Sequence, residues 1–335
     1  MRSKRPVVWI VLLSPILAGM FSIFMGAYNL SFFEVLSILF NGIFKGATQV
    51  SRPEAAIIFD IRLPRILLAG LVGVALSGSG AALQGIFRNP LVDPYLLGIS
   101  AGAAFGCAVS IGFLPWIPVQ VSAFFFGMLA VALTFLMASA QGEILRLSLV
   151  LSGVVVSSFF TAMLSIVKFM VDPNRLQSIV FWLMGSFSLS DWRSVRIAFL
   201  GVVIGMSPVF FMRWRLNAIS MGDDEARALG VNVRMERMML IGSTSLAVSI
   251  AVSVSGIIGW VGLMVPHLIR MMSGPDHKML LPLSIAGGAA FMILADTISR
   301  GMSNLEIPVG IITAISGAPF FMYLMRRGEK GLFKG

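Results

Sequence analysis

Residues that could bind phosphate or metal are sparse in this sequence of 335 residues. No lysine follows a glycine, so the G-x-x-x-x-G-K-[ST] loop that cradles nucleotide phosphates cannot form, and the chain does not hydrolyse ATP by that route. His267, His277 and Cys107 are its only histidines and its only cysteine, too few to build a metal-ligand cluster within one chain. The 22 methionines are scattered and fit flexible apolar filler better than soft-metal binding. We expect no catalytic residue, no metal site and no cofactor in this chain.

Ionisable groups are rare within the apolar segments, and Asp296 is the main exception. A proton- or ion-coupled transporter generally needs a buried acid or histidine near the middle of the membrane. Asp296 precedes Arg300 by four residues, a helical spacing that lets the two side chains neutralise each other. The sequence favours this local ion pair, so the energy for any transport would come from elsewhere. An ion-coupled secondary transporter that uses Asp296 is the alternative.

The polar segment 213–237 could carry a docking element. Asp223, Asp224 and Glu225 suit the N-terminus of a helix, because the helix macrodipole attracts negative charge there. Gly230 would stop this helix, and a second short helix would continue into the Arg234–Arg237 stretch. Two short helices between apolar segments would suit a cytoplasmic partner, and a solvated linker fits the spacing equally well.

The composition explains why such sites are few. Hydrophobic residues make up 57% of the chain and charged residues only 12%, whereas soluble domains are usually near one half and one quarter. Ten spanning helices need about 200 mostly apolar positions, which is nearly the number available. The sequence predicts an all-α integral membrane protein with one domain over residues 1–335. It excludes a soluble enzyme, a disordered chain and a disulfide-stapled secreted domain. The net charge of +10 fits basic cytoplasmic loops better than nucleic-acid binding.

Stretches without Asp, Glu, Lys or Arg locate the predicted spans. They cover 6–33, 66–87, 94–142, 147–167, 197–212, 238–269, 279–295 and 307–325. The third divides at 112–118 and the sixth at 256–259, which gives ten spans. With both termini in the cytoplasm, 16 of the 25 basic residues lie on that side, which supports this orientation. The uncharged stretch 176–190 is expected at a membrane interface. Glycines at four-residue spacing (98, 102 and 106; 201 and 205) favour close helix packing.

Several motifs occur together, in an order and spacing typical of one family. The loop Gly222–Val233 resembles the coupling segment of permeases that import ferric siderophores, haem and vitamin B12, the membrane subunits of type II ABC importers. Other segments that resemble family signatures are RLPR at 62–65, QGIFRNPLVDP at 84–94, FWLMGS at 181–186, GWVGLMVPHLIR at 259–270, GPDH at 274–277, and EIPVG at 306–310 with GAP at 317–319. The likeness runs from about residue 60 to the C-terminus.

The resemblance implies a ten-helix fold with cytoplasmic termini in a prokaryotic inner membrane. It also implies a homodimer, with two ATPase subunits on the cytoplasmic side that bind ATP and Mg²⁺. One extracytoplasmic substrate-binding protein would dock on the other side, and alternating access would move the substrate. Nucleic acid is not an expected partner.

The resemblance also assigns roles to residues in matching motifs. Arginines at the outer mouth would receive acidic residues of the binding protein: Arg62, Arg65 and Arg300. The ATPase-coupling role falls on Asp223, Asp224, Glu225, Ala226, Arg227, Leu229, Gly230 and Val231. The cytoplasmic gate would include Asn89 and Leu91 in one turn, and Leu147 and Ser148 before the fifth span. Ferric siderophore, haem, cobalamin and molybdate are all cargoes of similar permeases, so the cargo stays open.

Overall fold

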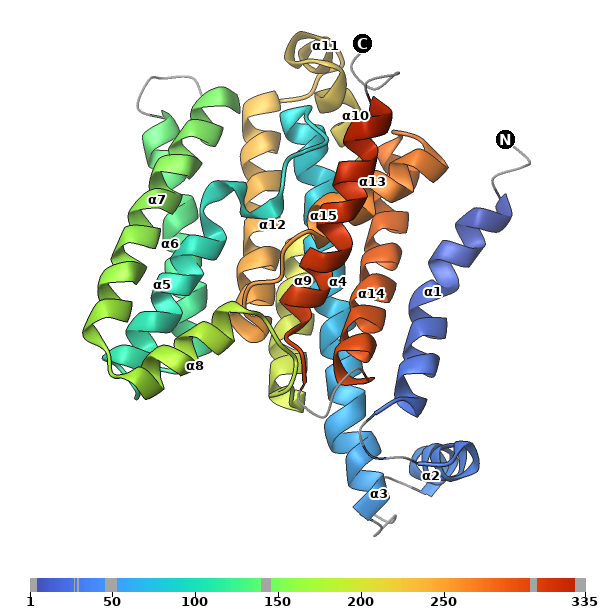
Figure 1. Cartoon of the computed structure of the whole chain (residues 1–335). Coiled ribbons are helices and arrows are strands. Elements are labelled where there is room, and N and C mark those ends of the chain that lie inside the picture. The colour runs from blue at the N-terminus through green and yellow to red at the C-terminus, as the bar shows by residue number, and fades with distance from the viewer. Residues whose placement is uncertain are drawn as a thin grey trace.

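The computed structural model describes residues 5–26, 28, 30–45, 53–139, 146–301 and 306–328, and within these ranges the secondary structure is helical without strands (Figure 1). This confirms the predicted all-α fold. The first described helix begins, and the last one ends, at the end of the bundle where α11 lies (Figure 1).

The N-terminal part of the chain supplies the central helix of the bundle. Its elements are α1 (Arg5–Phe24), α2 (Phe32–Lys45), α3 (Pro53–Ala56), the π-helical turn η3 (Ile57–Arg62) and α4 (Leu63–Phe87). The sequence did not reveal α2 and α3 as separate helices. Most of α4 is buried, and it packs against α9, α12, α13 and α14. Its many Gly, Ala and Ser residues allow these neighbours to approach closely.

A second group of helices lies beside this centre. It consists of η4 (Pro94–Leu97, a 3-10 turn), α5 (Ile99–Gly112), α6 (Val119–Ser139), α7 (Arg146–Met170) and α8 (Pro173–Leu183). Helices α5, α6 and α7 contact one another, and α8 packs against α5 (Figure 1). Helix α8 covers part of the uncharged stretch 176–190, and its position at an interface stays a prediction.

The C-terminal half completes the bundle around α4. It contains α9 (Trp192–Phe211), α10 (Arg213–Met221), α11 (Asp223–Ala228), α12 (Val233–Ser255), α13 (Val261–Ser273), α14 (His277–Gly301) and α15 (Val309–Gly328). Helices α12 and α13 are separated by residues 256–260, the break predicted from Gly256 and Gly259. Trp260 adopts a left-handed backbone with φ of 73° at the start of α13.

Each predicted span contains one helix: α1, α4, α5, α6, α7, α9, α12, α13, α14 or α15. Within the described ranges seven helical segments are long and apolar enough to cross a membrane, counting α3, η3 and α4 as one. Helices α5 and α13 and the apolar part of α15 are shorter. The locations are therefore confirmed, and ten as the number of crossings stays a prediction.

Small residues bring α5 against α6. A Cβ atom added at Gly102 would lie 2.3 Å from the Phe126 carbonyl oxygen, and one at Gly106 would lie 2.4 Å from that of Ser122. These glycines therefore serve packing, as the sequence predicted. Gly98 differs, because it adopts a left-handed φ of 84° in the turn between η4 and α5.

Candidate coupling, docking and substrate sites

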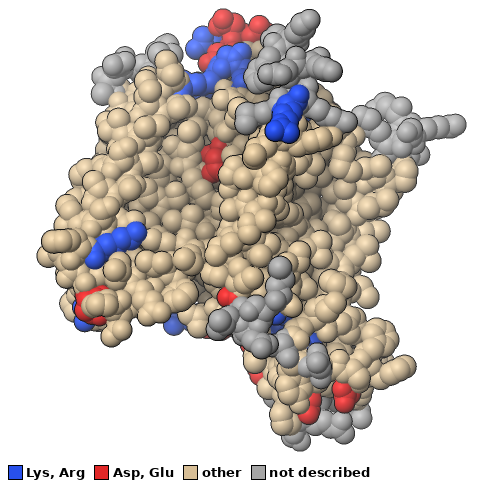
Figure 2. Space-filling view, in the orientation of Figure 1, with Lys and Arg blue, Asp and Glu red and all other residues tan. Residues whose placement is uncertain are grey.

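Charged side chains gather mainly toward the two ends of the molecule, and the view in Figure 2 shows few of them between these ends. The predicted coupling helix α11 lies at one end, whereas the arginines of η3 and early α4 lie at the other (Figure 1). A bundle of membrane-crossing helices would expose these two ends to opposite aqueous compartments.

Local sequence fixes where α11 begins and ends. Its first turn carries the three acidic residues at 223–225, which favour the positive end of the helix dipole. At the other end, Gly230 has a left-handed φ of 77°, and its N–H donates to the Arg227 carbonyl oxygen at 2.9 Å. The Val231 N–H donates to the Ala226 carbonyl oxygen at 3.0 Å, which completes a Schellman cap. The predicted helix stop at Gly230 is confirmed.

The second short helix of the loop differs from expectation. The residues near Arg234 form the first turn of the long helix α12, because the Asn232 side chain caps that helix through the Met235 N–H. The other short helix is α10, which precedes α11. It is held to the start of α14 by Asn217, whose side chain donates to Asp276 at 2.6 Å and accepts from the His277 N–H at 2.8 Å.

The eight predicted coupling residues divide into two faces. Ala226 and Val231 are buried against the permease, and the Asp223 side chain is partly covered. The remaining five residues are exposed: Asp224, Glu225, Arg227, Leu229 and Gly230. The Asp224 side chain is 94% exposed and pairs with Arg227 at 3.3 Å. The outer face of α11 and its cap is therefore available to a partner, while the inner face holds the helix in place.

Asp223 is the polar anchor of the inner face. Its carboxylate accepts from Arg237 NH2 at 2.8 and 2.9 Å and forms a second ion pair with Arg146 of α7. Burial by itself would raise the pKa of Asp223, but the hydrogen bond and charge of Arg237 and the charge of Arg146 hold that pKa below its usual value. The carboxylate is therefore ionised throughout the neutral pH range.

At the opposite end, two predicted docking arginines belong to a buried ion-pair network. Arg65 donates through Nε to both oxygens of Asp296 at 2.9 and 3.1 Å, and through NH1 to Glu306 at 2.8 Å. Arg300 Nε lies 3.2 Å from Asp296, which confirms the predicted local ion pair. Arg300 NH2 also donates to the Ser22 hydroxyl at 2.7 Å. Glu306 is the exposed member of the network, with 44% of its side chain accessible.

The third predicted docking arginine is also buried. Arg62 NH1 donates to the carbonyl oxygen of Ile23 at 2.7 Å, and NH2 donates to that of Tyr28. All three guanidinium groups thus have partners inside the chain, and of these partners the sequence indicated only Asp296 for Arg300. Their role in docking stays a prediction.

The predicted gate residues lie at the same end as α11. Arg88, which caps α4, donates to the Met221 carbonyl oxygen at 3.4 Å and so places the following turn beside α10. In that turn the Asn89 side chain accepts the Leu91 N–H at 2.9 Å, and Leu91 is exposed. Leu147 is exposed in the first turn of α7, and Ser148 is half-buried. Their gating role stays a prediction.

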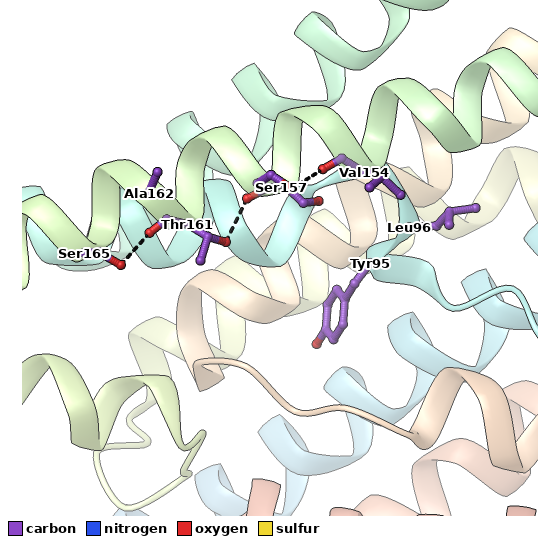
Figure 3. Close-up of a pocket in the computed structure, with 8 residues that line it drawn as sticks. Tyr95, Leu96, Val154, Ser157, Thr161, Ala162 and Ser165 are labelled. Carbon is purple, nitrogen blue, oxygen red and sulfur yellow. Dashed lines mark hydrogen bonds between the residues drawn. The ribbon is translucent and has the colours of Figure 1, made fainter.

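An open pocket of about 600 Å³, lined by apolar surface with several hydroxyl groups, lies between α7 and the η4 turn (Figure 3). Its lining residues are Tyr95, Leu96, Val154, Ser157, Ser158, Thr161, Ala162 and Ser165. The hydroxyls of Thr161 and Ser165 donate to carbonyl oxygens four residues earlier, so the helix satisfies these donors itself. The Tyr95 hydroxyl donates to the Ile258 carbonyl oxygen at 2.9 Å. No charged residue is among the eight.

Sequence reasoning missed this cavity, although a signal was present. Hydroxyl residues recur at 157, 158, 161 and 165 within the uncharged run 147–167, which places them along one side of a helix. In a membrane span, such a polar stripe faces protein or water more readily than lipid. In the described part of the chain, no cluster of three or more His, Cys, Asp or Glu residues occurs that could hold a metal ion.

Comparison with known proteins gives consistent matches along nearly the whole chain. The model of the FecCD transport family matches residues 12–327. A probable iron chelatin transport system permease protein of Helicobacter pylori (strain ATCC 700392 / 26695) is 46% identical over 271 residues, covering 81% of this chain and 82% of that protein. The molybdate import system permease protein MolB of Haemophilus influenzae is 39% identical over 318 residues, covering 94% of each.

A solved structure agrees with the fold. It is described as an inward-facing conformation of an ABC transporter of metal-chelate type. It superposes with a TM-score of 0.85 at 37% identity, covering 96% of this chain and 99% of the other.

Proposed function

This chain belongs to the FecCD transport family, as a multi-pass permease of the ABC type in the inner membrane, and we propose that it imports a metal chelate. The family match confirms the resemblance drawn from the loop at 222–233 and the other motifs. The rest of the proposal concerns the partners, the path and the cargo.

We propose that two copies of the chain assemble with two ATPase subunits and one extracytoplasmic binding protein. The exposed outer face of α11, with Leu229 64% accessible, would contact the ATPase. The arginines near Glu306 would meet acidic groups of the binding protein at the other end, where Arg–carboxylate pairs favour steered, reversible docking. ATP binding and hydrolysis in the partner would then drive alternating access.

The cavity beside α7 would form part of the substrate path. Its lining offers several hydroxyl groups and no charge, so an ionic metal without a chelator would lose its hydration without compensation there. A chelate carries its own ligands, and its N–H and O–H groups can donate to the hydroxyl oxygens of this lining. We therefore place an iron chelate first among the cargoes, in line with the 46% identical relative. Haem, cobalamin and molybdate are the other candidates.

The observation that carries this proposal is the position of the outer face of α11, at the end opposite the arginine network (Figure 1). The test begins with purification of the chain from native membranes in mild detergent and identification of bound proteins by mass spectrometry. We expect a stoichiometric ATPase. Vesicles containing that complex and the binding protein should then take up a ferric siderophore in the presence of ATP, with haem, cobalamin and molybdate tested in parallel.

An ion-coupled transporter is the alternative, and Asp296 is the group it would use. The structure encloses that carboxylate between Arg65 and Arg300, with 1% of its side chain exposed. Arg65 also holds Glu306, and Arg300 also holds Ser22, so Asp296 belongs to a network that links several segments, which favours a structural role. Purification without any ATPase, together with uptake driven by an ion gradient, would support the alternative and overturn the proposal.

A further inference from the structure

One carboxylate joins the coupling helix to two membrane helices. Asp223, the first residue of α11, pairs with Arg146, the first residue of α7, and with Arg237, in the second turn of α12. The Arg237 side chain is buried, and Arg146 is partly buried. The carboxylate thus lies where a shift of α11 reaches two other helices at once.

The two arginines connect to different parts of the bundle. Helix α12 packs against α4, α6 and α9, so Arg237 ties α11 to the centre of the bundle around α4. Helix α7 packs against α5 and α6, and much of its surface is exposed. Movement that enters through α11 therefore meets a well-packed anchor at α12 and a less constrained helix at α7.

We propose that the Asp223–Arg146 ion pair transmits movement of the coupling helix to α7, with Arg146 as the positioning residue. This inference rests on the proposed function, because the movement originates in the partner ATPase. The partner would act on the exposed face of α11, at Asp224, Glu225 and Leu229. Asp223 lies on the opposite, covered face and passes the movement to the first turn of α7.

Arg146 lies directly before the predicted gate residues, on the same helix as residues that line the pocket. The next two residues, Leu147 and Ser148, are those predicted to form the cytoplasmic gate, and Ser157 and Thr161 of the same helix line the open pocket beside η4. A tilt or translation of the first turn of α7 would change both the cytoplasmic opening and the cavity lining. An arginine–carboxylate pair suits this task because its directional hydrogen bonds hold orientation as well as distance.

The test uses the complex of the chain with its ATPase and a thiol reporter at L151C, an exposed position of α7. The single native cysteine, Cys107, is buried and is replaced by C107A. Labelling of L151C by a small membrane-permeant maleimide is measured with and without ATP and vanadate. We expect ATP to change the labelling rate in the otherwise native chain. R146Q should abolish this change while ATP hydrolysis by the partner continues, and R146K should keep it.

A matched control removes a positive charge from the other end of the same helix through K168Q, which should leave the ATP response intact. Retention of the full ATP response in R146Q would overturn the inference. A complex that hydrolyses ATP but in which ATP does not change the labelling rate of L151C would also overturn it. If R146Q does not assemble, R146K and the milder D223N report on the same link, and an unchanged response in D223N would equally overturn it. A chain that recruits no ATPase at all would instead overturn the proposed function.

Discussion

Asp296 and Arg65 are 231 residues apart in the sequence, yet the Asp296 carboxylate accepts two hydrogen bonds from Arg65 Nε in the buried end of the bundle. This contact joins α4 to α14, and Arg300 brings α1 to the same carboxylate through Ser22. The network therefore closes the end of the bundle that is proposed to face the binding protein.

Loss of the central carboxylate should destabilise this end strongly. D296N would leave Arg65 and Arg300 charged and buried with one fewer counter-charge, which we expect to cost about 3–5 kcal/mol. Thermal unfolding in detergent checks this. E306Q is the matched control, because Glu306 is partly exposed and its removal should cost about 1 kcal/mol or less. Equal stability of D296N and the native chain would contradict the structural role of the network.

A substitution at Gly230 should disturb the cap of α11 through backbone strain rather than through steric overlap with neighbouring atoms. A Cβ atom at Gly230 would meet nothing within 4 Å, but the residue has a φ of 77°. G230V should therefore strain the cap by about 1–2 kcal/mol and lower the transport obtained per ATP hydrolysed. G230N is the control, since asparagine tolerates this conformation, and it should stay close to native. A G230V complex with native coupling would show that the cap shape is not needed.

Acidification should stabilise the turn before η4. Burial raises the pKa of Asp93 to about 6, although the hydrogen bond from the Tyr95 N–H acts in the opposite direction. The Asp93 carboxyl therefore binds a proton more tightly in the folded chain than in the unfolded chain, where the pKa of an aspartate is about 4. Lowering the pH from neutral through about 6 should relieve the cost of a buried charge. As the pH falls, the unfolding temperature of the native chain should therefore rise relative to that of D93N. The asparagine is a suitable control because it keeps an oxygen that can accept from the Tyr95 N–H. Unfolding temperatures that change in parallel with pH in both proteins would refute this.

The hydroxyl stripe of α7 should matter for cargo movement. Removing three cavity hydroxyls in S157A/T161V/S165A should weaken cargo binding by about 0.5–1.5 kcal/mol for each hydrogen bond lost, and uptake by reconstituted vesicles should fall. S207A is the control, because that α9 hydroxyl also bonds four residues back, at Val203, but lies outside the cavity. Native uptake by the triple variant would exclude these hydroxyls from the path.

Features set by neighbouring residues were predictable from the sequence. Uncharged runs located the helices of the ten predicted spans. Gly230 marked the end of α11, and the four-residue spacing of Asp296 and Arg300 indicated their ion pair. Each of these depends on residues within one or two helical turns. The second predicted loop helix was misplaced, since the Asn232 cap that begins α12 was not recognised.

Contacts between distant segments were not predictable. Arg146 lies 77 residues before Asp223, and no periodicity in either segment reveals their pairing. The same holds for the ion pair of Arg65 with Glu306, which lie 241 residues apart. The exposed side of α7 was equally ambiguous, because apolar and hydroxyl residues both occur on helix faces that meet lipid, protein or water.

The turn that ends α11 owes its shape to its own main chain. Two backbone hydrogen bonds, from Gly230 and Val231, hold its path, and the Leu229 side chain extends from it into solvent. The outward side chains can therefore be substituted without disturbing the backbone path, which depends on Gly230 and these two hydrogen bonds. Recognition of a partner on this face would therefore depend on side chains that can be changed one at a time, while the helical framework that presents them keeps its shape.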